Sequence, residues 1–385
     1  AWRNTGNVPV NVVYTVRPVS ASGCIGAPVE IILTVDPEPV LDPGLNATVC
    51  SNDAAGIILN TNGTSIAAGT YNITSIITNG LTADAGNPVT GTGFNANEIA
   101  DDVWRNFGAT NVNVLYTIVP LSDPADGACI GKPVVVTLTV RPEPVLANNL
   151  DRTVCSDNNI GLTLNTNGVS VAAASYNIIS ITADAGLVPD AGNVGPANGV
   201  ANNYLNNLRF TNTTTGNLQV VIRVAPVSAQ ACIGEEEDII ITIQPEPVIS
   251  PGLDLTACSG LATGLQLSTT AGSVAAATYN VTNILVSGGL SPRLGNALVA
   301  NGVSADYLEL DAFTNASAIP LTVSYTVRPV SAAGCLGDPV VIVVTVNPEP
   351  VIASNLNRTV CSDEIAGITL NTNGVSVTAA DFDLL

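Results

Sequence analysis

The chain has 385 residues, of which 46% are hydrophobic, 4% aromatic and 11% charged, and its formal net charge is -20. This composition excludes a disordered chain, which would carry more charge and fewer hydrophobic residues. The 31 acidic residues against 11 basic ones exclude nucleic acid and anionic lipid as partners, because binding either requires basic patches. The absence of histidine removes the commonest general base and metal ligand, together with any Ser–His or Cys–His nucleophile pair.

The sequence repeats itself every 103 to 105 residues. The tetrapeptide Pro-Glu-Pro-Val begins at Pro37, Pro142, Pro245 and Pro348, and a Thr-(Val/Ala)-Cys-Ser motif recurs at the same spacing. This register predicts a partial repeat at 1–38, whole repeats at 39–143, 144–246 and 247–349, and a partial repeat at 350–385. Because both ends cut the register, we expect the chain to be part of a longer tandem array.

Each repeat is predicted to end in a β-hairpin. The first strand of this hairpin lies at Asn11–Val19 in the first copy, at Val112–Val119 in the second and at Thr322–Val330 in the last. A small turn with Gly-Cys follows, and then a second apolar strand such as Val134–Val140. These segments are rich in Val, Ile, Thr and Tyr and are bounded by turn residues, and no segment has helical spacing. The length and the pattern predict an all-β chain of tandem immunoglobulin-like (PKD-like) β-sandwich domains.

The Pro-Glu-Pro-Val segments are predicted to be the joints between sandwiches. Proline fixes its own φ and restrains the preceding residue, so each joint should be extended and stiff, and the array an elongated rod. We interpret the glutamate as a solvated residue. The alternative is an ion pair with an arginine of the neighbouring repeat, for which Arg152 and Arg358 are candidates. The predicted joint residues are Pro37, Glu38, Pro39, Pro142, Glu143, Pro144, Pro245, Glu246, Pro247, Pro348, Glu349 and Pro350.

Eight cysteines occur two per repeat, without the clustered spacing of a zinc site, which indicates disulfides and an oxidising compartment. Two pairings fit the spacing. The short one joins Cys24 to Cys50 across the joint, and the long one lies inside each repeat. We favour the long one, because a strand of about ten residues at ~3.3 Å each should separate Cys24 from Cys50 by far more than the ~7 Å limit between Cα atoms. The predicted pairs are Cys50–Cys129, Cys155–Cys232 and Cys258–Cys335, with Cys24 and Cys361 paired outside the chain.

Carboxylates are the remaining candidates for catalysis, and they cluster at Asp101–Asp102, Asp123 with Asp126, Glu235–Asp238 and Asp363–Glu364. None of these clusters recurs in every repeat, so we interpret them as solvated surface charge and expect no catalytic residue and no enzyme activity. No cofactor is expected. The segment around Asp123 and Asp126 has the oxygen ligands that Ca²⁺ prefers, which makes it a weak candidate for calcium, but it is an insertion in one repeat only.

Aromatic residues offer little for carbohydrate binding. The two tryptophans, Trp2 and Trp104, occupy equivalent positions before the hairpin, and we expect both in the core. No apolar segment reaches the ~18–20 residues of a membrane helix, so direct membrane insertion is not expected.

The combined motif resembles a known family. Tyr-Thr-Val-Arg-Pro-Val-Ser, then Gly-Cys-Ile-Gly, a Val-rich strand, Pro-Glu-Pro-Val and Arg-Thr-Val-Cys-Ser are similar to the PKD-like repeats of giant Bacteroidota surface proteins, in particular the gliding-motility adhesins exported by type IX secretion. The resemblance covers the whole chain. It implies an extracellular, cell-surface filament that grips the substratum and works with the outer-membrane secretion and motility machinery.

From these observations we expect a structural shaft segment of a filamentous adhesin for gliding motility and surface attachment. Its partners would be adjacent repeats of the same polypeptide and, through other regions, the substratum or surface polysaccharide. One alternative is an array of carbohydrate- or protein-binding modules, which binding by these domains alone would favour. The other is a spacer stalk of a secreted hydrolase, which a catalytic domain in the same polypeptide would favour.

Overall fold

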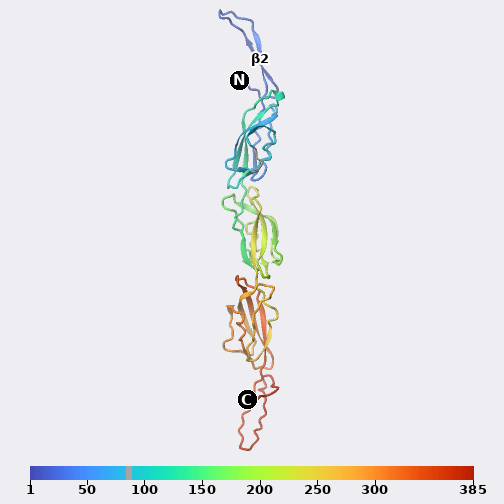
Figure 1. Ribbon diagram of the computed structural model, residues 1–385, viewed down its shortest axis with the longest axis vertical. Coiled ribbons are helices and arrows are strands. Elements are labelled where there is room, and N and C mark those ends of the chain that lie inside the picture. The colour runs from blue at the N-terminus through green and yellow to red at the C-terminus, as the bar shows by residue number, and fades with distance from the viewer. Residues whose placement is uncertain (84–88) are drawn as a thin grey trace.

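The computed structural model describes residues 1–83 and 89–385, and it is an elongated rod (Figure 1). A β-hairpin projects at the N-terminal end, three similar β-domains follow in line, and a loop of irregular chain forms the C-terminal end. The one helix within the described residues is the 3-10 turn η1 at Pro124–Asp126. No helix in the described part of the chain is long and apolar enough to cross a membrane.

The first whole repeat contains a five-stranded sheet in the order β3-β9-β8-β4-β6 and a two-stranded sheet, β5-β7. The first strand, β3, runs parallel to β9, and the other neighbours are antiparallel. The second layer of the sandwich is therefore small and is completed by irregular segments. The strands are β3 (Ala47–Cys50), β4 (Thr70–Ile77), β5 (Thr82–Ala83), β6 (Gly91–Phe94), β7 (Trp104–Arg105), β8 (Val112–Leu121) and β9 (Val134–Arg141).

The next two repeats have the same strand order, β10-β16-β15-β11-β13 with β12-β14, and β17-β23-β22-β18-β20 with β19-β21. In the second repeat the strands are β10 (Arg152–Cys155), β11 (Ala173–Ala183), β12 (Val188–Pro189), β13 (Ala197–Val200), β14 (Phe210–Thr211), β15 (Leu218–Ser228) and β16 (Glu237–Gln244). In the third they are β17 (Leu255–Cys258), β18 (Ala276–Val286), β19 (Leu290–Pro292), β20 (Ala300–Val303), β21 (Phe313–Asn315), β22 (Leu321–Ser331) and β23 (Val340–Asn347).

The predicted hairpins are present in all four copies. The strand pairs are β8 with β9, β15 with β16, β22 with β23 and, at the N-terminal end, β1 (Val10–Val16) with β2 (Val29–Val35). Alternate residues of each hairpin in the whole repeats point into a core of Val, Ile and Leu, as a half-buried strand requires. The all-β, tandem-sandwich fold predicted from the sequence is confirmed.

The two tryptophans differ in burial. Trp104 is 3% exposed in the core of the first whole repeat, as predicted, whereas Trp2 is 60% exposed, so the prediction for Trp2 was wrong. The reason is that residues 1–38 supply one hairpin and no second layer to cover it. The hairpin valines and isoleucines, such as Val13 and Ile31, are exposed for the same reason.

Candidate functional site: the junctions between repeats

The structure pairs the cysteines between repeats. Cys50 bonds to Cys232 with a Cα–Cα distance of 5.4 Å, and Cys155 bonds to Cys335 at 5.3 Å. In each pair a cysteine at the end of the first strand of one repeat joins a cysteine in the hairpin turn of the next repeat. The predicted pairs Cys50–Cys129, Cys155–Cys232 and Cys258–Cys335 were therefore wrong, and so was the short alternative, Cys24–Cys50.

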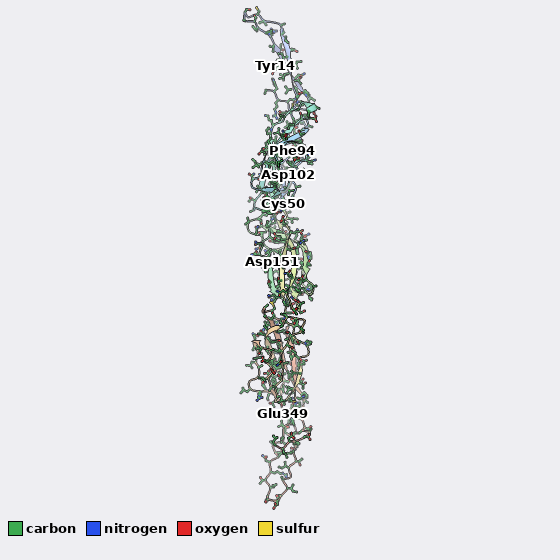
Figure 2. The ribbon with its side chains drawn as sticks, viewed as in Figure 1. Tyr14, Cys50, Phe94, Asp102, Asp151 and Glu349 are labelled. Carbon is green, nitrogen blue, oxygen red and sulfur yellow. A yellow bond between two sulfur atoms is a disulfide. The ribbon has the colours of Figure 1, made fainter. Side chains whose placement is uncertain are left out.

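The parallel pairing of the first and last strands explains this correction. Cys50 lies opposite Arg141, the last residue of β9, so it sits at the exit of its sandwich. Cys129 precedes β9, and eight strand residues at ~3.3 Å each place it about 26 Å away, at the other end. That distance is far beyond the ~7 Å that a disulfide spans. Figure 2 shows Cys50 on the side of Asp102 that faces the next repeat.

The unpaired cysteines follow the same rule. Cys24 and Cys129 are hairpin-turn cysteines of the first two copies, whereas Cys258 and Cys361 are first-strand cysteines of the last two. By this rule the partner of each would lie in a part of the neighbouring repeat that residues 1–385 do not include. The turn cysteines that are paired, Cys232 and Cys335, are fully buried.

A buried asparagine organises the exit of each repeat. Asn212 is fully buried, and its side-chain Nδ2 donates to the backbone oxygens of Gly216 and Ile243, both at 2.9 Å. Its Oδ1 accepts from the backbone N and the hydroxyl of Thr214, at 3.1 and 2.7 Å. Its own backbone N donates to the hydroxyl of Ser156, the residue after the disulfide cysteine. The asparagine therefore ties the joint to the last strand and to the disulfide strand.

The same arrangement recurs in every copy that has the residues for it. Asn106 and Asn315 donate to the last-strand oxygens of Val140 and Val346, and Asn4 donates to that of Val35. The backbone N of each joint glutamate donates to the backbone oxygen of this asparagine, at 2.9–3.1 Å, in the pairs Glu38–Asn4, Glu143–Asn106, Glu246–Asn212 and Glu349–Asn315. The joint is thus a fixed part of the preceding repeat.

The following repeat is held to the preceding one by backbone hydrogen bonds across each junction. The four bonds run from Ile66 N to Gly6 O, Val171 N to Gly108 O, Val274 N to Thr214 O and Val377 N to Ser317 O, at 2.9–3.2 Å. A serine of the same turn accepts from the residue that follows each Pro-Glu-Pro segment, as Ser170 does from Val145 N at 3.0 Å. Equivalent contacts at all four junctions make them structurally alike.

Two of the joint glutamates are buried. Glu143 is 1% exposed and Glu246 is 3% exposed, so the interpretation of these residues as solvated was wrong. The prolines on either side of them pack between two sandwiches and exclude water from the carboxyl groups. Burial, together with the charges of Asp157 and Asp338, raises the pKa of Glu246 to about 7, and burial with the nearby Glu235 also raises the pKa of Glu143.

An ion pair does cross one junction, but it does not involve the predicted arginines. Arg105, in β7 of the first whole repeat, forms an ion pair with Glu235, which lies in the hairpin turn of the second whole repeat. Arg152 donates instead to the backbone oxygens of Asn149 and Asp151, and Arg358 donates to that of Gly367. In the N-terminal copy Glu38 pairs with Arg3 of its own repeat.

The hairpin turn packs directly on the preceding joint through a glycine. A Cβ atom added to Gly234 would lie 1.9 Å from the carbonyl oxygen of Pro144, and Gly131 and Gly337 meet Pro39 and Pro247 in the same way. Real Cβ atoms do not approach an oxygen this closely, so the glycine two residues after the turn cysteine is required for the turn to dock.

We expect Gly234→Ala to destabilise the junction between the first and second whole repeats by about 1–3 kcal/mol. The added methyl group would force the hairpin turn away from the carbonyl oxygen of Pro144 in the joint. Urea unfolding followed by hydrogen exchange in β15 and β16 measures the loss. Gly216→Ala in the same repeat is the matched control, because a Cβ there meets nothing within 4 Å. Equal stability of the two variants would contradict the expectation.

One predicted surface carboxylate belongs to the core. Asp102 is 1% exposed, and its Oδ2 accepts from the hydroxyl of Tyr116 at 2.6 Å, which in turn accepts from the Trp104 indole N–H at 2.8 Å. Burial raises the pKa of Asp102 to about 7. The interpretation of Asp102 as solvated was wrong. Side chains alternate between the inner and outer faces along residues 102–104, and Asp102 faces inward like Trp104. Tyr325 repeats the contact with Asp311 at 2.7 Å.

In the segment predicted as a weak calcium candidate, the carboxylate of Asp123 binds a backbone N–H group. The side chain of Asp123 accepts from the backbone N of Ala125 at 2.9 Å and caps η1, and Asp126 lies in that turn. Among residues 1–83 and 89–385, no three His, Cys, Asp or Glu side chains gather where they could hold a metal ion. The other acidic clusters are exposed.

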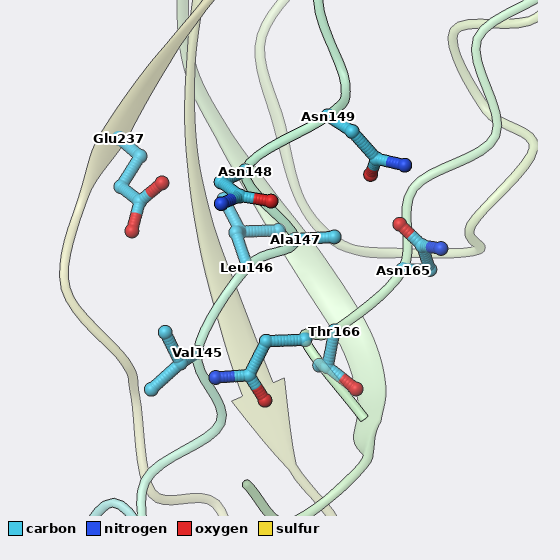
Figure 3. A pocket seen from close by; sticks show the side chains of 9 residues that line it. Val145, Leu146, Ala147, Asn148, Asn149, Asn165, Thr166 and Glu237 are labelled. Atoms are coloured by element: carbon cyan, nitrogen blue, oxygen red, sulfur yellow. The ribbon is translucent and has the colours of Figure 1, made fainter. Parts of the chain in front are cut away.

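A pocket of about 570 Å³ opens on the second whole repeat beside its joint (Figure 3). Its lining is polar, with four asparagines, Thr166 and Glu237 around Val145. None of its nine lining residues is aromatic, and the equivalents of Asn148 and Asn149 in the first repeat are Pro43 and Gly44. This asparagine-rich lining is therefore not repeated in the first whole repeat.

The sequence reasoning missed the asparagine and the serine of each junction. Both have a readable signal, since Asn4, Asn106, Asn212 and Asn315 recur at spacings close to the repeat, and a serine follows every first-strand cysteine. Polar residues that recur with a joint motif indicate a shared hydrogen-bond role.

The PKD-like domain family model matches residues 2–39, 47–144 and 296–350. Each matched segment ends at the last proline of a Pro-Glu-Pro joint. By its fold, the chain is a tandem array of PKD-like domains. The unmatched residues 145–295 have the same strand order as their matched equivalents, so the PKD-like architecture extends through all three whole repeats.

Solved structures of other multidomain proteins are similar to these PKD-like repeats over most of their length. Drosophila N-cadherin EC1-4 is 12% identical, with 90% of this chain and 94% of that chain covered and a TM-score of 0.21. The Bacteroides ovatus mixed-linkage glucan utilization locus protein SGBP-B is 14% identical, with 86% and 73% covered and a TM-score of 0.14. The sialic acid binding region of the Streptococcus sanguinis SK1 adhesin is 11% identical, with 83% and 81% covered and a TM-score of 0.18. At these TM-scores the likeness carries no argument. No curated protein matches the chain.

Proposed function

We propose that the chain is a structural shaft segment of a long filamentous adhesin at the cell surface, which spans distance and bears load for surface attachment and gliding motility. The observation that carries the proposal is the recurring junction. The buried joint, the asparagine, the cross-junction hydrogen bonds and the disulfides hold successive repeats in one orientation. These contacts resist bending and separation of neighbouring repeats, which supports a mechanical role.

The disulfides and the PKD-like fold are those of a secreted or extracellular protein. Placement at the cell surface, type IX secretion and contact with the outer-membrane motility machinery are parts of the proposal. Its immediate partners are adjacent repeats of the same polypeptide, and the substratum or surface polysaccharide is gripped by other regions. In the proposed longer array, Cys24, Cys129, Cys258 and Cys361 bond to cysteines of further repeats.

A role without catalysis is part of the same proposal. Of the buried carboxylates with a raised pKa, Asp102 faces a tyrosine in the core and Glu143 and Glu246 lie in the joints, and the exposed acidic clusters do not recur between repeats. The alternative of carbohydrate- or protein-binding modules gains little from the pocket of Figure 3, whose lining has no aromatic platform and whose Asn148 and Asn149 are Pro43 and Gly44 in the first repeat. The other alternative, a spacer stalk of a secreted hydrolase, would have the same rigid junctions but would require a catalytic domain elsewhere in the polypeptide.

The proposal is tested by shape and by adhesion. Electron micrographs of the purified chain should show straight rods of one length, and beads coated with it should not adhere to polysaccharide or glass above the level of beads coated with an unrelated protein. Saturable adhesion of the coated beads would favour the binding-module alternative. Particles bent at variable angles would overturn the load-bearing shaft.

A further inference from the structure

The two disulfides are interlaced along the chain. Their cysteines follow in the order Cys50, Cys155, Cys232 and Cys335, so that the loop closed by each disulfide contains one end of the other. Both close long loops, with sequence separations of 182 and 180 residues. Pairs inside single repeats would instead form separate loops side by side.

We propose that this interlacing gives the rod a covalent load path that bypasses most of the chain and limits its extension even when the sandwiches unfold. The inference deepens the proposed shaft function, because it concerns how the same junctions carry load. Tension that arrives at Cys50 crosses to Cys232 without passing through the residues between them. Three chain segments then connect the two disulfides, 50–155, 155–232 and 232–335, and the shortest sets the limit.

In the proposed longer array, where Cys258 also bonds to a further repeat, a shorter route leaves from Cys232. From Cys232 the chain reaches Cys258 through β16, the joint at Pro245–Pro247 and β17. Strands and proline-bounded joints have almost no slack, and this route would not pass through β11 to β15, which lie in the segment 155–232. Repetition of the pairing from one repeat to the next would continue this path along the array.

The position of the disulfides protects the path. Cys232 and Cys335 are fully buried, in turns whose glycines Gly234 and Gly337 pack on the joints. A reductant reaches the sulfur atoms of Cys232 and Cys335 only when the junction opens, whereas their partners Cys50 and Cys155 are half-buried. The junction packing and the disulfide therefore support each other.

Single-molecule stretching between residues 1 and 385 tests the inference, in a background where the four unpaired cysteines are serine. Reduction of both disulfides should lengthen the fully unfolded chain by about 700 Å, since about 210 residues are released at ~3.4 Å each. Removal of one pair, by C50S/C232S or by C155S/C335S, should lengthen it by only about 90 Å, because the other disulfide still bypasses nearly the same residues. The gains are therefore strongly non-additive.

In this background the one disulfide that can form inside a single repeat is Cys155–Cys232, and its reduction would lengthen the chain by only about 260 Å, a result that would overturn the inference. So would no change in length on reduction. Non-reducing peptide mapping of the same protein supplies the independent control, with Cys50 linked to Cys232. The measurement does not depend on adhesion, so its failure is distinguishable from a failure of the shaft proposal, which the bead and micrograph tests decide.

Discussion

The first whole repeat will be more stable at pH 5 than at pH 8, by about 2–4 kcal/mol, because of Asp102. Burial raises the pKa of this carboxyl to about 7 in the folded state, from 3.8 in an unperturbed aspartate. The folded state therefore binds a proton that the unfolded state has already lost. The stabilisation is complete below the unfolded pKa and is lost as pH rises through about 7.

Fluorescence of Trp104 measures this effect in one repeat. Trp104 donates to Tyr116, the partner of Asp102, and the chain's other tryptophan is removed by W2F, so that urea unfolding reports the first repeat alone. In a background with Glu143→Gln, which removes the other buried carboxyl of this repeat with a raised pKa, Asp102→Asn should abolish most of the pH dependence and stabilise the repeat at pH 8. The exposed neighbour, in Asp101→Asn, is the control. Equal stability at the two pH values, or a slope that survives Asp102→Asn, would contradict the explanation.

Asn212→Ala will destabilise the second whole repeat by about 3–5 kcal/mol, which is enough to unfold a marginal domain. The substitution removes two donors and one acceptor from a fully buried side chain and leaves the backbone oxygen of Ile243 without this partner. Each unsatisfied buried group costs about 1–3 kcal/mol. The loss should weaken the joint too, because the Glu246 backbone N bonds to Asn212.

Hydrogen exchange in β15 and β16 during urea titration measures the loss in this repeat separately from its neighbours. The exposed Asn203 of the same repeat provides the control in Asn203→Ala. Asn212→Asp tests the donor role, because a carboxylate accepts but does not donate and should be nearly as destabilising. A loss below 1 kcal/mol for Asn212→Ala would show that the asparagine does not hold the junction.

The second whole repeat shows that the buried Asp–Tyr pair is not needed for the fold. Its equivalents of Asp102 and Tyr116 are Leu208 and Ile222, which are buried and apolar. A well-packed apolar pair can replace a buried polar pair without loss of stability, whereas removal of one partner is costly. The polar pair therefore makes the first repeat sensitive to pH, while the second lacks this cause of sensitivity.

The amino-acid sequence alone determined the array, the strands and the joints. The repeat of Pro-Glu-Pro-Val and the period-two pattern of segments such as Val112–Val119 depend on local chemistry, so they could be read without coordinates. The oxidising compartment followed from the even number of cysteines and the absence of histidine in the same way.

Only the tertiary structure decided which cysteines pair and which carboxylates are buried. The cysteine spacing is compatible with several pairings, and the choice depends on β3 running parallel to β9, which carries Cys50 to the exit of its sandwich. The burial of Glu143 depends on the next repeat packing over the joint, and that of Asp102 on which face of a short segment turns inward. These are contacts between residues far apart in the sequence, and local patterns do not encode them.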